Sequence, residues 1–597
     1  MAIGFKKISI QIGSDDFVKK IPSGFRSLSL NQSIAQHHYL KLVFRWDSIE
    51  DGAELLKNSV KYLGKKLELT IVTEESEVTQ KEESLKFIGI VSGINSTRSN
   101  NFSGDSIIIL ATSPEIIMDD GSHAKSFSEK NLDDIANEVL GEYSDLVCET
   151  SVKSNTKTGT HSFIVQYNET SYRFLNRLAG KYGQWFYFNG SKLIFGEREK
   201  SKPIDLKYGK NIYNFNLKLD VQPYAFSFVA YDYKDDQEQK YESDDSSQDI
   251  SLSKIGEEVA GFSEELFNHK SKILYNHGLS TGKQQDHLDH RVFLKKAGKG
   301  SGMVVCSGQT DCPLLMVGGE IKISEKNADH GSYIVVDLNH SVDRNGEYSN
   351  SFTAIPVECE IPFTANPHSI PLCETQSAVV VENEDPDNMG RIRVKFFWQE
   401  DDEMTPWLRI VSPYAGKEKG LLFVPEIDEE VIVGFEGGNA EKPFVFGALY
   451  HAKAYPESWK PDNNDVKAIR TRSGHTIEFR DTDGEEEIWI YDYNKENYFI
   501  KFKSHAQEIT IEAIEHIQLK AKNISIIAEK DLKIEATDAT TKASGNISTE
   551  ASGNITQEAS GNISSEASGN MKIKGGANTT IEAGVQLEEK AAIVKIN

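Results

Sequence analysis

The chain has 597 residues, a formal net charge of −25 at pH 7 and 38% hydrophobic residues. That length predicts several domains, and the hydrophobic content is sufficient for buried cores. The acidic balance argues against nucleic acid or an anionic membrane surface as the main partner, whereas a solvated acidic surface and a basic partner both fit it.

The cysteines and the lack of long apolar runs argue against a metal site, a membrane-spanning segment and a cleaved signal peptide. Cys148, Cys306, Cys312, Cys359 and Cys373 are odd in number and lack the spacing of a metal site, so we expect reduced thiols, no metal and no cofactor. No run of 18 apolar residues occurs, and the first residues lack the apolar core of a signal peptide. If the protein leaves the cell, we expect a route other than a cleaved signal.

Residues 1 to about 115 are predicted to be mostly β. Short alternating runs such as Leu40-Leu42-Phe44 and Leu67-Leu69-Ile71 lie between turn residues. They predict strands in a barrel or a sandwich, with one short helix around Gly52–Leu63.

Two helices and a hairpin are predicted next. Ser126–Tyr143 carries one apolar face, and a second helix is predicted from the candidate N-cap Asn168 to Gly183. The strand Trp185–Phe188 is followed by Asn189-Gly190 and another apolar run, which is typical of a β-hairpin. Its aromatic side chains would form core or, alternatively, a platform for a ligand.

The middle of the chain is expected to hold a loop, further strands and a domain boundary. Acidic and polar residues dominate 232–249, which predicts a solvated loop. Short strands are expected again over 285–375. Three Pro-containing pairs between Ile361 and Pro371 mark the predicted boundary.

Five short strands are predicted between Ala378 and Gly447. Turn residues at Asp385–Asn388, Pro413–Gly416 and Gly437–Asn439 separate them, and so many strands in so short a stretch suit a Greek-key barrel of the OB type. OB barrels often bind nucleic acid, but the acidic stretch Glu400–Glu403 and the net charge argue against that function here.

An eight-residue repeat occupies the C-terminal region. Ala543, Ala551, Ala559 and Ala567 open units that continue with Ser-Gly-Asn, and an apolar residue follows each alanine four positions later. A degenerate form of the unit runs upstream from Ala513, and predicted strands between 465 and 503 lead into it. Self-similarity at a fixed period indicates a repeat architecture.

Three architectures compete for these octads. A coiled coil needs a period of seven and strong helix formers, which the octads lack. A disordered linker fits the Ser, Gly and Asn content but not an apolar residue at every eighth position. A β-helix fits both the Ser, Gly and Asn content and the regular apolar residue, with Ser-Gly-Asn at corners where Gly and Asn tolerate positive φ. The β-helix is favoured, and the linker stays open.

One apolar residue per octad is too little to fill a β-helix made by a single chain. We therefore expect three chains to wind together around a shared core, which leaves no lateral strand edge. The predicted fold class is mainly β, with N-terminal β-barrel domains and a few helices, an OB-fold barrel and a C-terminal intertwined trimeric β-helix. The predicted core residues of that β-helix are Ile517, Ile524, Leu532, Ile547, Ile555, Ile563 and Met571.

Two patterns suggest chemistry only weakly. Gly278-Leu279-Ser280-Thr281-Gly282, with His277 beside it, fits the nucleophile-elbow pattern, but its polar flanks do not predict the buried strand and the helix that the motif needs. Asp286, His287, Asp289 and His290 lack further ligands at a recognisable spacing. We expect no enzyme activity, no catalytic residue and no metal ligand.

The motifs resemble a known family. Gly390-Arg391-Ile392-Arg393-Val394 after Asp385-Pro386, with Pro413-Tyr414-Ala415-Gly416, resembles the OB domain of VgrG proteins, the trimeric spikes of type VI secretion systems. Arg472–Ile477 resembles the neck of that family, Gln166–Thr170 resembles its hub, and the octads match its shaft. Gly438–Glu441 departs from the acidic Asp-Pro-Asp turn of many relatives, and the chain ends soon after the octads, so we expect no C-terminal effector domain.

The resemblance implies domains, partners and location. The expected domains are a hub of two barrel domains at 1–372, an OB domain at 375–452, a neck at 465–503 and the spike at 504–597. The expected partners are two further copies of the chain, an Hcp-like tube protein at the hub, baseplate proteins, a PAAR-type tip protein or effector at the C-terminal tip and, transiently, a target membrane, with no nucleic acid. Ile593, Val594 and Ile596 are predicted to dock the tip protein.

The implied function is that of a hub and spike that caps the tube, punctures a membrane and carries a cargo. The protein would sit in the bacterial cytoplasm within the assembled apparatus and then reach the medium or a target cell. Two alternatives stay open. One is the spike of a phage tail or of an extracellular contractile injection particle. The other is a β-helical glycan-binding or glycan-cleaving tail spike, although the region after Ser504 has no aromatic residue.

Overall fold

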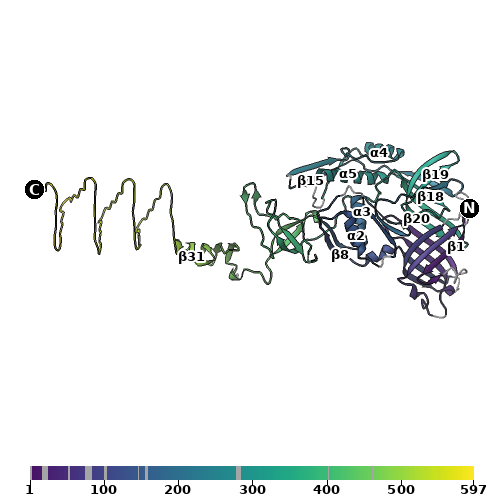
Figure 1. The fold of residues 1–597 in the computed structure, drawn as a ribbon, viewed down its shortest axis with the longest axis horizontal. Helices are drawn as coiled ribbons and strands as arrows, with labels where there is room; N and C mark the ends of the chain where they lie inside the picture. Colours follow the sequence, from purple (N-terminus) through teal and green to yellow (C-terminus); the bar gives the residue numbers. More distant parts are fainter. Residues whose placement is uncertain are drawn as a thin grey trace. The chain divides into compact units, whose positions relative to one another are not determined.

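A computed structural model describes residues 3–16, 24–51, 54–73, 84–99, 104–144, 147–154, 159–234, 236–276, 284–400, 402–459 and 463–596. The chain divides into two compact units, Met1–Ser458 and Trp459–Asn597 (Figure 1). Strands predominate in both units, so the predicted mainly-β class with barrels and a few helices is confirmed. Within the described ranges, no helix is both long and apolar enough to cross a membrane.

The first barrel is formed by neighbouring antiparallel strands in the order β3-β4-β7-β6-β5-β1. Side chains alternate across each strand, so Leu40, Leu42 and Phe44 are buried while Lys41 points to solvent. The strands are β1 (Ile3–Ile12), β2 (Asp15–Asp16), β3 (Phe25–Ser33), β4 (Tyr39–Arg45), β5 (Lys66–Thr73), β6 (Ser84–Thr97) and β7 (Ser106–Thr112), and the 3-10 helices are η1 (Trp46–Ser48), η2 (Val60–Tyr62) and η3 (Pro114–Asp119).

The helix predicted around Gly52–Leu63 is wrong for the residues that the structure describes there. Only the 3-10 turn η2 forms, because Leu56 has a positive φ of 62° that no α-helix accommodates. The buried carboxylate of Glu50 accepts hydrogen bonds from the amides of Asn58 and Ser59 at 2.8 and 3.0 Å. This side-chain anchor replaces helical hydrogen bonds.

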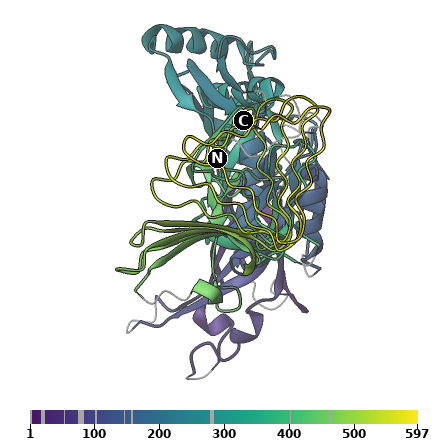
Figure 2. The same cartoon turned by 90° about the vertical axis from the view of Figure 1, so that its left-hand side faces the viewer.

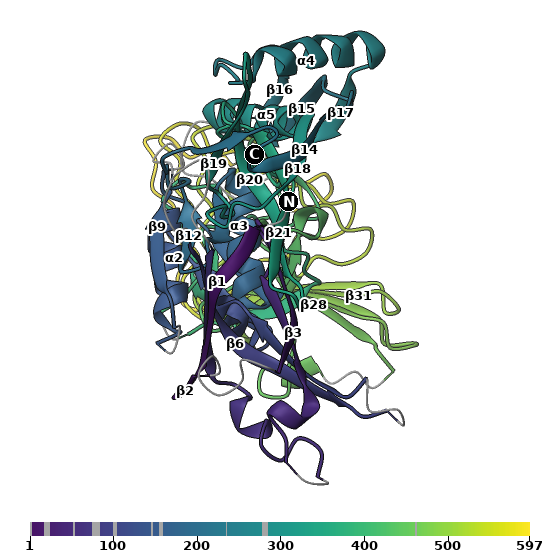
Figure 3. The ribbon, with the colours of Figure 1, turned by 90° about the vertical axis from the view of Figure 1, so that its right-hand side faces the viewer.

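A second barrel continues the same sheet. Strand β20 pairs with β3 of the first barrel, and β21 pairs with β1, so a single thirteen-stranded sheet links the two. Its core includes Ile321, Leu338 and Phe352. The strands are β13 (Ile204–Lys207), β14 (Ile212–Leu219), β18 (Val304–Thr310), β19 (Glu320–Glu325), β20 (Ala328–Val342) and β21 (Glu347–Pro356), several of which are labelled in Figure 3.

Two helices pack beside the barrels much as predicted. The second helix, α3, ends at Gly183 with φ +64°, as expected, but its N-cap is Thr170 and not Asn168. The first, α2, is capped by Asn131, and Ser126 lies in strand β8, which pairs with β10. The Asn189-Gly190 hairpin is confirmed, and its aromatic residues are buried core. The elements are β8 (His123–Phe127), α2 (Leu132–Gly141), β9 (Glu149–Lys153), β10 (Ile164–Glu169), α3 (Ser171–Tyr182), β11 (Trp185–Phe188) and β12 (Lys192–Gly196).

A small α/β layer corrects two further predictions. The acidic stretch 232–249 contains strand β16, which pairs with β15 because Tyr241 packs on the Phe226–Phe228 core. Helix α5 occupies part of the range where strands were predicted, with Leu288 and Val292 buried in the same core. The elements, gathered at the upper end of Figure 3, are β15 (Phe226–Asp232), β16 (Gln237–Glu242), α4 (Lys254–Leu266), β17 (Ser271–Leu274) and α5 (Gln284–Ser301).

The OB region forms a sheet in the order β23-β22-β26-β27 around Val380, Val394 and Val433. The strand predicted at Trp407–Val411 is reduced to single bridges, from Leu408 to Ile392 and from Ile410 to Val445. The elements are β22 (Gln376–Glu382), β23 (Arg393–Phe396), β24 (Ala415–Gly416), β25 (Lys419–Gly420), β26 (Glu430–Phe435), η5 (Glu436–Gly438), β27 (Pro443–Ala448) and η6 (Glu457–Trp459).

The second unit starts with a five-stranded antiparallel meander, β28-β29-β30-β31-β32. After it, residues 514–596 form no strand, and Figures 1 and 2 show their trace as a series of similar turns. The β-helix of octads therefore stays a prediction. The strands are β28 (Val466–Arg470), β29 (Thr476–Arg480), β30 (Glu487–Asp492), β31 (Asn494–Lys503) and β32 (Glu508–Ala513).

Candidate functional site

One face of the meander, which we call the apolar neck face, carries two rows of apolar side chains across the strands. The register places Ile469 opposite Ile477, Ile477 opposite Ile490, and then Ile500 and Ile511 in line. A second row on the same face lies two residues further along each strand; its apolar members are Phe479, Ile488, Phe502 and Ile509.

Within the described residues of the second unit, no segment covers the apolar neck face. The exposed fraction is 39% for Ile477, 44% for Ile490 and 59% for Ile511. A large contiguous apolar patch on a folded unit marks an interaction surface, because leaving it in water costs about 25 cal/mol for each Å². The apolar neck face therefore needs a partner.

The opposite face of the same sheet, which we call the polar face, carries charged side chains together with Trp489, Tyr491 and Phe499. The buried carboxylate of Glu478 accepts hydrogen bonds from the Tyr491 hydroxyl at 2.7 Å, from Lys495 at 2.8 Å and from Arg480 at 3.1 Å. Burial opposes ionisation, but these donors outweigh it and lower the pKa of Glu478. Glu478 and Tyr491 are thus buried on this face, whereas the apolar neck face leaves its large side chains exposed, which makes the apolar neck face the candidate association surface.

The octads also leave their apolar residues exposed. The exposed fraction of the predicted core residues lies between 52% for Ile517 and 62% for Ile547, so one chain does not bring them into a core. Bends recur at the Ser-Gly pairs that begin at Ser544, Ser552 and Ser560, which agrees with the predicted corners. A single chain in this state has no burial to offset the entropy of ordering.

The glycines at these corners are informative. The positive φ expected there is not found: Gly545, Gly553, Gly561 and Gly569 all lack it. A Cβ added to any of the four would meet nothing within 4 Å. Neither the backbone nor the space within this chain therefore requires a glycine at every eighth position.

The predicted tip residues are also uncovered. Ile593, Val594 and Ile596 are exposed by 74%, 51% and 88%. Their predicted role in docking a tip protein stays a prediction.

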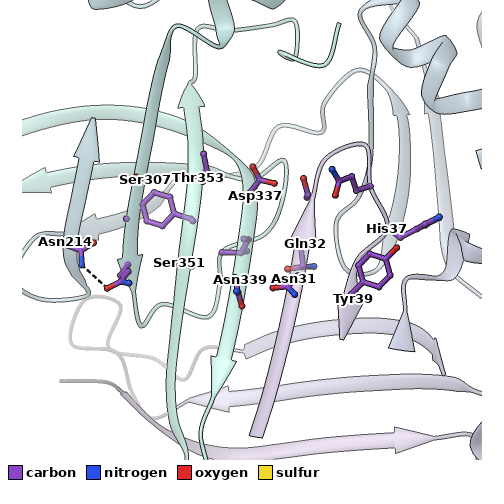
Figure 4. A pocket seen from close by; sticks show the side chains of 16 residues that line it. Asn31, Gln32, His37, Tyr39, Asn214, Ser307, Asp337, Asn339, Ser351 and Thr353 are labelled. Carbon is purple, nitrogen blue, oxygen red and sulfur yellow. Dashed lines mark hydrogen bonds between the residues drawn. The ribbon is translucent and has the colours of Figure 1, made fainter. Parts of the chain in front are cut away.

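A polar pocket of about 530 Å³ lies on the sheet that joins the two barrels (Figure 4). One ladder of hydrogen-bonding side chains crosses it, with Gln309 opposite Ser351, Ser351 opposite Asn339, and Asn339 opposite Asn31. Asn214 continues the ladder by donating to Gln309 at 2.9 Å. The pocket thus presents neutral hydrogen-bonding groups rather than a charged cluster.

The pocket does not bring together a nucleophile and a base. Its one histidine, His37, is turned toward Glu115 at 3.3 Å and Asp119 at 2.9 Å, and these hydrogen bonds raise its pKa although burial opposes them. Asp337 is the one carboxylate that lines it. This arrangement can bind but offers no general acid–base pair.

The two weak sequence motifs, the elbow-like segment and the Asp/His cluster at 286–290, do not form a site among the residues that the structure describes. The elbow-like segment 277–283 lies outside the described residues, as do the side chains of Asp286 and His287. Asp289 accepts a hydrogen bond from the Ser247 amide at 3.0 Å, and His290 stacks on Phe293. In the part of the chain that the structure describes, no group of three metal-binding side chains occurs, and all five cysteines are free.

Two family models match the chain. The phage tail baseplate hub model matches residues 49–346, and the type VI secretion system/phage-baseplate injector OB domain matches residues 376–450. Together they account for more than half of the chain and correspond to the barrel region and to the OB sheet.

Two curated relatives found by sequence are spike proteins, in agreement with these models. The type VI secretion system spike protein VgrG5 of Pseudomonas aeruginosa is 26% identical over 400 residues, which covers 60% of this chain and 48% of the relative. The spike protein VgrG3 of Vibrio cholerae is 22% identical over 413 residues, covering 62% of this chain and 38% of the relative. The chain thus spans about half or less of these relatives.

The fold has a counterpart among solved structures. A chain of the Francisella PdpA–VgrG complex aligns with a TM-score of 0.53 and 10% identity, covering 85% of this chain and 88% of that one. This likeness concerns the fold alone. The two family models and the related spike proteins show that the chain belongs to the VgrG family of spike proteins.

Proposed function

We propose that the chain is the hub and spike of a bacterial contractile injection apparatus of the type VI class and that it works as a homotrimer. The observation that carries the proposal is the apolar neck face, which continues along the chain into the exposed octad residues. Both surfaces belong to the same unit, and both lack a partner within one chain.

Three copies fit these surfaces better than one or two. Each octad supplies one large apolar residue, so a closed core needs one wall from each of three chains. The glycines at 545, 553, 561 and 569 then have a reason, since a neighbouring chain would approach the backbone closely there. A shaft built in this way pairs its backbone between chains and transmits force along its length.

The native mass of the purified full chain tests the trimer. Light scattering after gel filtration should give about 200 kDa for three chains of 66.7 kDa. A mass near that of one chain would refute the shared core and would favour the linker interpretation of the octads.

The partners are part of the proposal. The match to a baseplate hub model supports docking of an Hcp-like tube and of baseplate proteins on the barrels. The exposed apolar residues Ile593, Val594 and Ile596 support docking of a PAAR-type tip protein or effector at the C-terminal tip, and the tip would touch the target membrane transiently. A chain truncated before residue 590 should lose the tip protein in a pull-down, and retention would refute this docking site.

The protein acts without catalysis in this proposal. The relatives VgrG5 and VgrG3 are named as spike proteins, and the polar pocket of the barrels offers no acid–base pair. It would reside in the bacterial cytoplasm within the apparatus and leave the cell with the tube. Detection in the medium should therefore require an intact sheath protein, and export without it would contradict this route.

A further inference from the structure

A second pocket, of about 600 Å³, lies beside the C-terminal half of α5 and outside the apolar faces described above. Two lysines of one helical face, Lys295 and Lys299, line it together with Gln222, Phe363 and Asn366. Because they are four residues apart, their ammonium groups project to the same side of α5.

The two ammonium groups crowd the same aromatic ring. The Nζ atoms of Lys295 and Lys299 lie 5.5 and 5.9 Å from the centroid of the Phe226 ring. Lys295 also lies 5.9 Å from the centroid of Phe228. The ring faces attract each cation, but they do not cancel the repulsion between the two.

Carboxylates do not neutralise this pair. No Asp or Glu of the described chain lies within ion-pair distance of Lys295 or Lys299, although the chain as a whole has a net charge of −25. The one acid that lines the pocket, Asp220, pairs with Lys218. Lys299 donates to the carbonyl oxygen of Pro223, a neutral partner.

The charged forms of the basic groups at this pocket are disfavoured, as their lowered pKa values show. Burial, and then the neighbouring Lys299, lower the pKa of Lys295 to about 8. Burial also lowers the pKa of Lys299. The pKa of His368 falls to about 4 through burial and through repulsion from both lysines. A bound anion would favour the charged form of each group and so offset these effects.

We propose that this pocket binds a phosphate group between the ammonium groups of Lys295 and Lys299. A doubly charged oxyanion matches two cations. The side-chain oxygen of Asn366 accepts a hydrogen bond from the backbone amide of His368 at 3.3 Å, which leaves the side-chain nitrogen of Asn366 to donate at the rim of the pocket. Phe363 supplies an apolar wall for the remainder of a phosphate monoester.

Calorimetric titration of the full chain with inorganic phosphate at constant ionic strength tests the site. We expect one phosphate per chain, with affinity weakened about tenfold or more in Lys295→Met/Lys299→Met. Lys200→Met/Lys202→Met, which removes two exposed lysines, should bind as the unmodified chain does. Equal affinity in all three proteins, or no binding to the unmodified chain, refutes the proposal.

Titration with phenyl phosphate identifies the source of the anion. Tighter binding than that of inorganic phosphate indicates a phosphate monoester whose body packs on Phe363, whereas equal binding indicates free phosphate. Lysine acylation followed by mass spectrometry needs no variant: phosphate should slow the labelling of Lys295 several-fold and leave Lys200 unaffected. Unchanged labelling of Lys295 at saturating phosphate refutes the site even if the double variant fails to fold.

Discussion

Lys181, in the last turn of α3, and Glu441, in the turn that precedes β27, form an ion pair in which both side chains are almost completely buried. The pair joins the hub region to the OB region across 260 residues of sequence. Arg177 adds a second cation on Glu441 at 3.4 Å and holds Glu169 at 2.7 Å. This turn is the one that departs from the usual acidic pattern of the family.

The Glu441→Gln substitution should strongly destabilise the first unit. It leaves Lys181 and Arg177 with too little negative charge in a buried setting, and breaking such a pair typically costs about 3–5 kcal/mol. Urea unfolding followed by tryptophan fluorescence measures the change. Glu197→Gln, which removes the partner of Lys153 in an exposed pair, should change the free energy of unfolding by less than about 1 kcal/mol. Equal effects of the two variants would show that the buried pair does not stabilise the fold.

The loop before β23 depends on the ionised form of Asp385. Hydrogen bonds from Arg391, together with the backbone amides of Asp387 and Met389, hold the pKa of this carboxyl well below its usual value. The stabilisation is therefore complete above the unfolded pKa of about 3.9 and is lost as the pH falls through the folded pKa.

Asp385→Asn should accordingly lower the free energy of unfolding near neutral pH by about 3 kcal/mol, because the buried Arg391 loses its buried partner and keeps only the exposed carboxylate of Asp387. The gap between the two proteins should shrink as the pH falls below about 4, because the carboxyl of the unfolded chain takes up a proton there while the folded one stays ionised to lower pH. Unfolding curves at several pH values measure this gap. A gap that does not depend on pH would show that Asp385 acts by packing and not by charge.

The sequence correctly predicted the helix end and the hairpin turn that single residue types determine. Gly183 ends α3 because it adopts φ +64°, and Asn189-Gly190 turns a hairpin, both of which follow from the residue types alone. Strand β16 was missed because its acidic composition resembles a loop, and only its pairing with β15 stabilises it. Tertiary context overrides local composition there.

The association surface could be predicted only in part. The octad period is visible in the sequence, but the apolar neck face requires the register of five strands, since Ile469, Ile477 and Ile490 are aligned by pairing and not by spacing. The sequence predicted strands between 465 and 503 but not their register. The Lys181–Glu441 pair had no local signal at all.

Ile490→Asp should disrupt the trimer. It places a carboxylate in the middle of the apolar neck face, and in a trimer three such charges would be buried at several kcal/mol each unless they protonate. Sedimentation velocity should show a shift from three chains toward one. Thr510→Asp, on the polar face of the same sheet, should keep the native mass. If Ile490→Asp also retained it, the neck face would not lie between chains.

Ile555→Asp tests the shaft in the same way. Three carboxylates would meet in one layer of a shared β-helix, so the melting temperature of the trimer should fall markedly. Thr556→Asp, at the next position of the same octad, should have little effect because alternate side chains point to opposite faces of a strand. Unchanged melting of Ile555→Asp would exclude a core that the three chains share.

Gly553→Val separates a shared β-helix from a solvated linker. Within one chain the new side chain would meet nothing within 4 Å and φ is not positive, so an isolated chain should accept valine at no steric cost. In a trimer whose neighbouring backbone lies close to this corner, overpacking should cost about 1–3 kcal/mol at each of three sites. Thermal melting of the shaft, followed by the native mass, measures the difference, with Thr549→Val as a control that adds no bulk at a corner. A lower melting temperature for Gly553→Val alone places a second chain against the corner, whereas identical melting of both variants leaves the corner open to solvent.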